Sequence, residues 1–252
     1  MTNPTACLLI IGNEVLSGRT QDANLKYIAT RLGEIGIPLR EVRVIPDVPE
    51  TIVDTVNEVR AKYDHVFTTG GIGPTHDDIT SECVAAAFGV PWEPHPEAWR
   101  RLESHYARQN PPGDFNAARQ RMATMPRGAE LIDNIISIAP GFTMGNVHVM
   151  AGVPQVFEAM LDHVLPTLAH GRKMLSVAII SPYGEGEIGL RLGAIQKAHP
   201  ETSIGSYPRF GGGGFTTELI VRARDEAAMA AAAEDVRAML EAIRAEKESS
   251  PA

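Results

Sequence analysis

The chain has 252 residues, of which 44% are hydrophobic and 21% are charged. This length suffices for one large domain or for two smaller ones, and the composition is that of a globular protein with a buried core. The formal net charge of -8 excludes a general attraction to polyanions, so any phosphate binding must come from a local feature.

The first ninety residues alternate short apolar runs with helical patterns. The run Cys7 to Ile11 lacks polar alternation, which is typical of a parallel strand covered on both faces. Further strands are predicted at 39–45 and 65–69, and helices from Asp22 to Gly36, around 49–59, and from Asp77 or Asp78 to Phe88. Strands that alternate with helices predict βαβ units and a doubly wound, mostly parallel sheet.

Residues 90–128 are rich in Pro and Arg and carry two helical patterns, which indicates an insertion or lid between elements of the sheet. A hairpin is predicted over 138–150, with its turn at Gly145-Asn146, and a helix over 154–168. The composition changes near 169–172, where we place a domain boundary. Residues 1–170 are thus predicted to form an α/β domain.

Residues 171–252 are predicted to form a small α+β domain with an antiparallel sheet. Its expected strands are 175–180, 202–208 and 216–223, and its expected helices are 186–198 and 226–245.

Two features predict the compartment. Two cysteines, Cys7 and Cys83, are too few for a disulfide framework and lie among apolar residues, so we expect two reduced core thiols. The first residues lack a charged segment followed by an apolar one, and no apolar run approaches the ~20 residues of a membrane span. We therefore expect a cytoplasmic protein with no membrane partner.

The strongest motif is TTGGIGPTHDDIT at 68–80, where an apolar strand feeds a glycine-rich turn and then a helix. Glycines let the backbone approach an anion closely, and exposed N–H groups with the helix dipole favour phosphate. The motif is neither a Walker A loop nor a dinucleotide fingerprint, by its residues and spacing. The alternative is a plain βα turn with Asp77 or Asp78 as helix N-cap. The predicted ligand-binding residues are Thr69, Gly70, Gly71, Gly73, Pro74 and Thr75.

A second polar segment, GNEVLSGR at 12–19, follows the first predicted strand. It lies at the carboxyl edge of the sheet, where open α/β sheets bind ligands. Glu14 offers a metal ligand and Arg19 a cation, and the alternative is a polar loop with Asp22 capping a helix. The binding residues predicted here are Gly12, Glu14, Ser17, Gly18 and Asn24.

Two further features are predicted at this edge. Asp47 follows the second strand, and with Asp77 and Asp78 it completes an oxygen-ligand set for Mg²⁺ or another divalent cation. Alone, Asp47 is a capping or surface carboxylate. Gly152 and Pro154 form a strand-to-helix turn that faces the ligand in one interpretation and merely starts a helix in the other.

The motifs IGNEVLSGRTQDAN, TTGGIGPTHDDIT and AGVPQVFEAM together resemble the molybdopterin-binding domain of molybdenum-cofactor biosynthesis proteins. Their order and the tail with SIGSYP and ELIVRARD most resemble the N-terminal part of the competence/damage-inducible protein A family. The resemblance implies a three-layer α/β domain with a ligand phosphate on the glycine-rich loop. It also implies acidic residues near an Mg²⁺-nucleotide, at positions matched here by Asp78 and Asp47.

The resemblance has departures and further implications. Ala151 stands where the family usually has Pro, and Gln155 where it often has Glu, which leaves catalysis open. The C-terminal domain resembles the family's KH-like domain. Its segment Gly186 to Gly189 has the spacing of a nucleic-acid-binding loop, but Glu185 and Glu187 would repel a phosphate backbone. Nucleic acid is therefore not an expected partner.

Three functions follow from the resemblance. The first is a divalent-metal-dependent pyrophosphatase that acts on a nucleotide phosphoanhydride of the ADP-ribose or FAD class, with Asp78 and Asp47 as catalytic metal ligands. The second is a molybdenum-cofactor biosynthesis protein that binds or adenylylates molybdopterin. The third is a non-catalytic module for a phosphorylated nucleotide or pterin. A homo-oligomer, dimer or trimer, is expected, and the family's C-terminal amidohydrolase activity is expected to be absent for lack of room.

Overall fold

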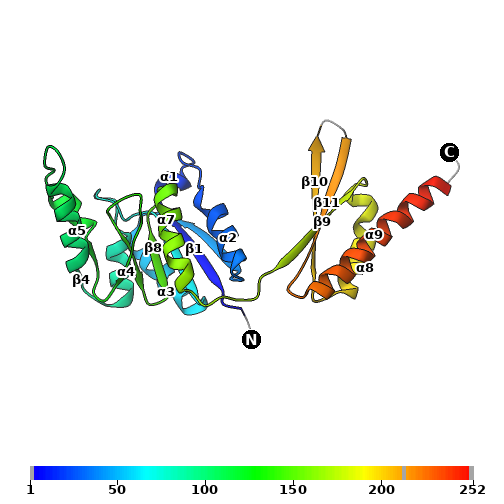
Figure 1. Cartoon of the computed structure of the whole chain (residues 1–252), viewed down its shortest axis with the longest axis horizontal. Helices are drawn as coiled ribbons and strands as arrows, with labels where there is room; N and C mark the ends of the chain where they lie inside the picture. Colours follow the sequence, from blue (N-terminus) through cyan, green and yellow to red (C-terminus); the bar gives the residue numbers. More distant parts are fainter. Residues whose placement is uncertain (1–2, 212–213, 250–252) are drawn as a thin grey trace. The chain divides into compact units, whose positions relative to one another are not determined.

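The structure is a computed structural model that describes residues 3–211 and 214–249, and it divides between Gly171 and Arg172 into two compact units. Figure 1 shows the helices and strands of both units, coloured along the chain and labelled where there is room. The first unit is an α/β domain built on a six-stranded sheet, and the second is a small α+β domain.

The sheet of the first unit has the strand order β2-β1-β3-β8-β7-β6. The first four strands of this order are parallel, and β7 and β6 each run antiparallel to the preceding neighbour. Every residue of β1 is buried, as expected for a strand covered on both faces. The predicted doubly wound, mostly parallel sheet is confirmed. The strands are β1 (Ala6–Ile11), β2 (Leu39–Ile45), β3 (His65–Thr69), β6 (Glu130–Ile132), β7 (Gly141–Met144) and β8 (Val147–Met150).

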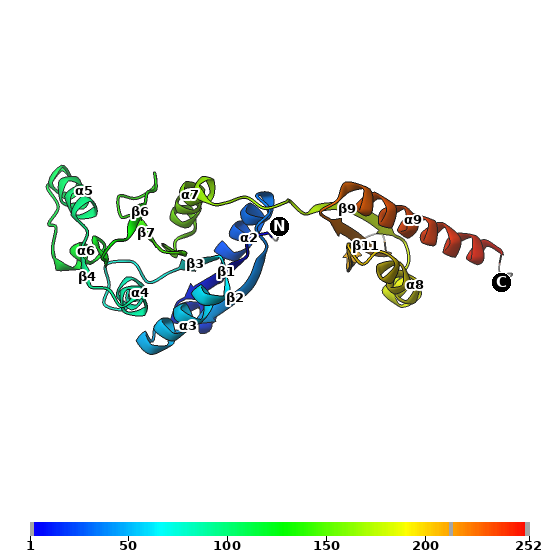
Figure 2. The ribbon, with the colours of Figure 1, turned by 90° about the horizontal axis from the view of Figure 1, so that it is seen from below.

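Helices cover both faces of this sheet and make three layers (Figure 2). The helices α2 (Asn24–Glu34) and α7 (Pro154–Val164) pack on one face, and α3 (Pro49–Lys62) and α4 (Thr80–Phe88) on the other. A short helix, α1 (Asn13–Leu16), follows β1. The helical spacing of apolar residues explains the packing, because it gathers them into one buried stripe on each helix.

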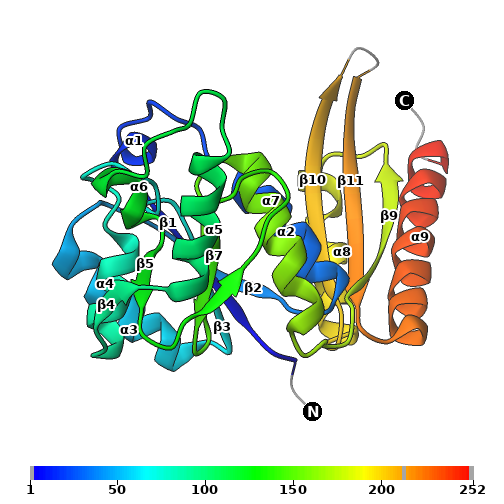
Figure 3. The ribbon, with the colours of Figure 1, turned by 60° about the vertical axis from the view of Figure 1, so that its left-hand side comes forward.

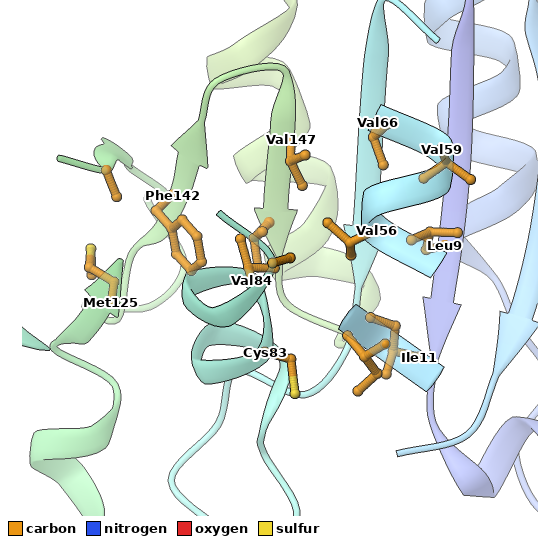
Figure 4. Packing of buried hydrophobic residues seen from close by; sticks show 14 of the residues in the cluster. Leu9, Ile11, Val56, Val59, Val66, Cys83, Val84, Met125, Phe142 and Val147 are labelled. Carbon is orange, nitrogen blue, oxygen red and sulfur yellow. The ribbon is translucent and has the colours of Figure 1, made fainter. Parts of the chain in front are cut away.

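The core beneath α3 and α4 shows this packing directly (Figure 4). Leu9 from β1 and Val66 from β3 meet Val56 from α3 and Cys83 from α4, and all four are buried. Both cysteines are free and buried, and burial raises the pKa of Cys7 and of Cys83 to about 11. The two thiols are therefore protonated at neutral pH and act as small apolar side chains.

The segment 90–128 forms a packed subdomain beside α4. Two short strands, β4 (Trp92–Pro94) and β5 (Thr124–Pro126), pair antiparallel, with α5 (Pro96–Ala107) and α6 (Ala117–Arg121) between them. Trp99 and Phe115 meet edge to face with ring centroids 5.0 Å apart, and Tyr106 stacks on Phe115. Ala98 and Leu102 of α5 are buried in the same core as α3 and α4, which fixes α5 against the domain.

Among the helix boundaries that differ from the sequence prediction, two have a clear local cause. The helix expected from Asp77 or Asp78 begins at Thr80, because the Asp78 carboxylate accepts hydrogen bonds from Thr75 instead of capping the helix. The helix expected over 154–168 ends at Val164 and continues as the 3₁₀ turn η1 (Leu165–Thr167). Pro166 explains this end, since proline has no N–H group for the α-helical hydrogen bond.

The second unit is the predicted α+β domain with an antiparallel sheet of order β10-β11-β9. Figure 3 shows its strands beside α9. The apolar sides of α8 and α9 pack on one face of this sheet around Ile188, Leu219 and Val236. Gly186 and Gly189 lie inside α8, so they form helix rather than an open loop. The elements are β9 (Leu175–Ser181), α8 (Glu185–Ala198), β10 (Ser203–Gly211), β11 (Gly214–Ala223) and α9 (Glu226–Ser249).

Over the described residues, 3–211 and 214–249, none of the helices combines the length and the apolar character that crossing a membrane requires.

Candidate functional site

Loops after three parallel strands meet at the carboxyl edge of the large sheet. The glycine-rich loop follows β3, the polar segment with Glu14 follows β1, and the turn with Gly152 follows β8. The Cα atom of Gly70 lies 3.3 Å from where a Cβ atom on Gly152 would sit, so two of these loops are in contact. The edge at which open α/β sheets bind ligands is thus assembled as predicted.

A cavity of about 660 Å³ lies at this edge, within the size range of small-molecule sites. Its polar side consists of backbone from the glycine loop and the side chains of two acids and a threonine. These residues are Glu14, Thr20, Gly70, Gly71, Gly73 and Asp78.

The remaining lining of the cavity is largely apolar. One part comes from the start of α7 and the turn before it, and another from Tyr106 of α5 and the loop between β6 and β7. The apolar lining includes Ile72, Tyr106, Met122, Ile138, Val153 and Met160. A ligand that combines an anionic group with a flat apolar group matches this mixed lining.

The glycine loop requires glycine at two positions. Gly70 has φ +104° and Gly71 has φ +69°, in the region that side chains rarely adopt. A Cβ atom on Gly70 would also overlap the carbonyl oxygen of Ile11, and one on Gly71 would overlap the hydroxyl of Thr80. The loop therefore lies directly against β1 and the first residue of α4.

The Asp78 side chain lies across the glycine loop. It accepts hydrogen bonds from the Thr75 N–H (2.8 Å) and the Thr75 hydroxyl (2.5 Å). A Cβ atom on Gly73 would lie 2.6 Å from its Oδ2 atom, so the carboxylate covers Gly73 as well. The predicted binding residues Pro74 and Thr75 do not line the cavity, and the Thr75 amide is already engaged by Asp78.

Glu14 supplies the second carboxylate of the cavity. It lies over Gly12, where a Cβ atom would be 2.5 Å from its Oε1 atom. Among the described residues that line this cavity there is no lysine or arginine, while Glu14 and Asp78 are both present. An anionic ligand would therefore be repelled unless a cation accompanied it.

The other two predicted metal ligands lie elsewhere. Asp47 follows β2, and its carboxylate accepts a hydrogen bond from the Asn13 N–H (2.8 Å), which fixes the start of α1. Asp77 is exposed, and neither residue lines the cavity. Within residues 3–211 and 214–249, no three His, Cys, Asp or Glu side chains gather as a metal site. The predicted trio of Asp47, Asp77 and Asp78 is thus not assembled. The carboxylate that lines the cavity together with Asp78 is that of Glu14.

Two predicted binding residues, Asn24 and Thr69, connect the glycine loop to the turn before α7. The buried Asn24 donates its Nδ2–H to the Thr69 hydroxyl (2.7 Å) and to the Gly152 carbonyl (3.0 Å). Thr69 in turn donates to the Ala151 carbonyl (3.2 Å). Asn24 and Thr69 therefore position the glycine loop and the turn before α7 rather than line the cavity.

Three residues of the polar segment after β1 do not line the cavity. Ser17 donates to the Glu14 carbonyl (3.2 Å), and Gly18 takes φ +73° with open space around it. Arg19 is exposed and does not line the cavity. Of the predicted turn before α7, Gly152 and Pro154 both line it.

Sequence reasoning missed the residues that the 90–128 subdomain contributes. Tyr106 and Met122 line the cavity, and Arg121 donates from Nη2 to the Asp78 carbonyl (3.0 Å). The Arg121 guanidinium also lies 5.1 Å from the centre of the Trp92 ring. The only signal in the sequence was the pair of helical patterns rich in arginine and aromatic residues.

The fold and the cavity define an α/β ligand-binding domain with a glycine-rich loop at the carboxyl edge of its sheet. Residues 7–170 match the family model described as a probable molybdopterin binding domain, and residues 173–248 match the middle domain of FAD synthase. The chain therefore belongs to the molybdopterin-binding domain family.

Individual relatives agree with this assignment. A protein of Pyrobaculum calidifontis is 33% identical over 215 residues, covering 82% of this chain and 81% of its own length. A CinA-like protein of Citrifermentans bemidjiense is 39% identical over 166 residues, covering 64% of this chain but 40% of the relative. The crystal structure of CinA from Thermoplasma acidophilum, of unknown function, matches with a TM-score of 0.60 and 29% identity, over 65% of this chain and 97% of that one. These matches confirm the resemblance to the competence/damage-inducible protein A (CinA) family and the α/β fold.

Proposed function

We propose that the first unit binds a phosphorylated nucleotide in the 660 Å³ cavity and, with a divalent cation, hydrolyses its phosphoanhydride. The ligand class is that of ADP-ribose or FAD. The observation that carries this proposal is the pairing of a glycine-loop backbone with two carboxylates, and no basic side chain, in one cavity. The match of the second unit to a domain of FAD synthase supports a nucleotide ligand.

The cavity chemistry fits Mg²⁺ or a similar cation. Mg²⁺ is usually held by one or two carboxylates together with the substrate phosphates, and Glu14 and Asp78 are two such carboxylates. We propose Asp78 as the main ligand and Glu14, rather than Asp47 or Asp77, as its partner. When bound, the cation would neutralise phosphate charge and make water a better nucleophile.

In this proposal, residues of the chain position the substrate. The backbone of Gly70 to Gly73 holds the phosphates near Asp78, and the apolar side with Tyr106 and Met160 holds the base and excludes water. Asn24 keeps the glycine loop and the Gly152 turn in contact. Arg121 donates a hydrogen bond to the Asp78 carbonyl and so fixes the backbone there.

A second candidate is binding or adenylylation of molybdopterin, which the description of the matching family favours. A pterin ring would occupy the same apolar side as a nucleotide base. A purely binding role would leave Asp78 without a chemical task. We also propose a dimer or trimer for the whole chain, by analogy with the family.

Turnover of ADP-ribose with Mg²⁺, Mn²⁺ or Co²⁺ tests the first candidate. Asp78→Asn keeps an acceptor for the Thr75 N–H but removes the charge, so we expect kcat to fall by ~100-fold or more. Asp77→Asn is the matched control, because Asp77 is exposed beside it and does not line the cavity.

The outcomes separate the candidates. Unchanged hydrolysis in Asp78→Asn contradicts the metal assignment. A product that requires both ATP and molybdopterin would identify an adenylyltransferase, and saturable binding without any product would identify a binding module.

A further inference from the structure

A second cavity, of about 370 Å³, lies on α5 next to the main one. Two arginines of α5, Arg100 and Arg101, and its C-cap residue Arg108 line it together with Ser104 and Ile138. Ile138 also lines the main cavity, so the two cavities adjoin at this residue. The basic lining contrasts with the main cavity, which has carboxylates and no basic side chain.

The three arginines differ in the hydrogen bonds and ion pairs that they make. Arg101 is held by Glu97 (2.6 Å) and by Asp133 (2.5 Å), and Arg100 makes two hydrogen bonds to Glu97 (2.9 and 2.7 Å). Arg108 is exposed, and its guanidinium has no ion pair or hydrogen bond with any residue in 3–211 or 214–249. One full positive charge therefore faces this cavity without a partner, in a chain of net charge -8.

Helix geometry places the charges in one row. Arg100, Ser104 and Arg108 are four residues apart, so their side chains share one face of α5. The row offers the unpaired Arg108 guanidinium next to the Ser104 hydroxyl, while Arg100 keeps its ion pair with Glu97. A guanidinium group binds phosphate by donating two parallel hydrogen bonds. Ionised carboxylates, such as those of the main cavity, accept hydrogen bonds and cannot donate them.

The main cavity is large enough to hold a whole nucleotide, so a simple nucleotide would not need the second cavity. We propose that it is a second anion subsite, which holds a monoester phosphate at the far end of a ligand whose phosphoanhydride lies on the glycine loop. The preferred ligands would be nucleotide pyrophosphates that carry an additional terminal phosphate. This inference rests on the proposed function of the main cavity.

Two nucleotides that differ by one phosphate test the subsite. Dissociation constants of ADP-ribose and of ADP-ribose 2′-phosphate are measured by calorimetry with Mg²⁺ present, on the full chain. The extra phosphate is expected to tighten binding about tenfold or more, as one charge-assisted arginine contact would. Arg108→Ala should abolish this advantage and leave the affinity for ADP-ribose unchanged.

Arg127→Ala is the matched control, because Arg127 is an exposed arginine of the same segment that pairs with Glu93 and lines neither cavity. It should retain the full advantage. Equal binding of the two nucleotides to the unmodified chain, or an advantage that survives in Arg108→Ala, overturns the subsite alone. If neither nucleotide binds, the proposed function and the subsite are both contradicted.

Discussion

Replacing Gly70 with alanine is expected to destabilise the first unit by ~3 kcal/mol or more and to abolish ligand binding. Two costs combine at this position. The backbone has φ +104°, and the new methyl group would overlap the carbonyl oxygen of Ile11 in β1. This oxygen belongs to a central strand, so it cannot move without disturbing the sheet. Denaturant unfolding of the first unit measures the loss of stability, and calorimetry measures binding.

Gly18→Ala is the control for the backbone cost alone. Gly18 also has a positive φ, +73°, but a methyl group there would meet nothing within 4 Å. We expect a loss of only ~1 kcal/mol and unchanged binding, since this glycine does not line the cavity. If both variants lost the same stability, the contact between Gly70 and Ile11 would not constrain the loop.

Acid is expected to destabilise the first unit through the buried His148 and the half-buried His65. His148 of β8 is buried against Phe67, with ring centroids 4.9 Å apart, and its Nδ1 atom lies 3.0 Å from the Thr143 hydroxyl. Its Nε2 atom faces the Nδ1 atom of His65 at 3.4 Å. Burial and the neighbouring His65 lower the pKa of His148 to about 3, and burial also lowers the pKa of His65.

The sign of the pH effect follows from these directions. An unfolded histidine has a pKa of ~6.5, so below this pH the unfolded chain is protonated at position 148 while the folded chain stays neutral there. Its contribution to stability is complete above pH ~6.5 and is lost as the pH falls toward the folded pKa. The free energy of unfolding should fall by ~1.4 kcal/mol per pH unit for His148, and by more where His65 adds to it.

The histidine effect can be separated from that of the carboxylates. Ion pairs and hydrogen bonds lower the pKa values of Glu41 and Glu97 to about 2, so these groups cost stability only below their ordinary value of about 4.5. Between pH 6.5 and 4.5, His148→Gln should therefore flatten the slope of stability against pH. The exposed His163→Gln is the control and should leave the slope unchanged. An unaltered slope in His148→Gln would show that this histidine does not resist protonation.

Much of the fold was predictable because its signals are local. The unbroken apolar run of β1 indicated a strand covered on both faces, and the spacing of Ile28 and Leu32 indicated the buried side of α2. The turn at Gly145 joins β7 to β8 with a positive φ, as glycine allows. In each case the residues that determine the local structure lie within or next to the element that they form.

The site was predictable only in part, because its details depend on contacts between distant segments. The glycine motif and its edge of the sheet were predicted, but no local pattern shows that the Asp47 carboxylate accepts a hydrogen bond from the distant Asn13 N–H. The far side of the cavity depends on how Tyr106 packs against Phe115 in a subdomain with few local signals.

Contact between a phosphate and the glycine loop is tested most directly by the amide chemical shifts of the full chain during titration with ADP-ribose and Mg²⁺. We expect the largest changes at the amides of Gly71, Ile72 and Gly73, smaller ones at Gly152, and none that depend on ligand at Gly18. Saturable shifts confined to residues outside this loop, with Gly71 to Gly73 unmoved, would contradict phosphate binding there.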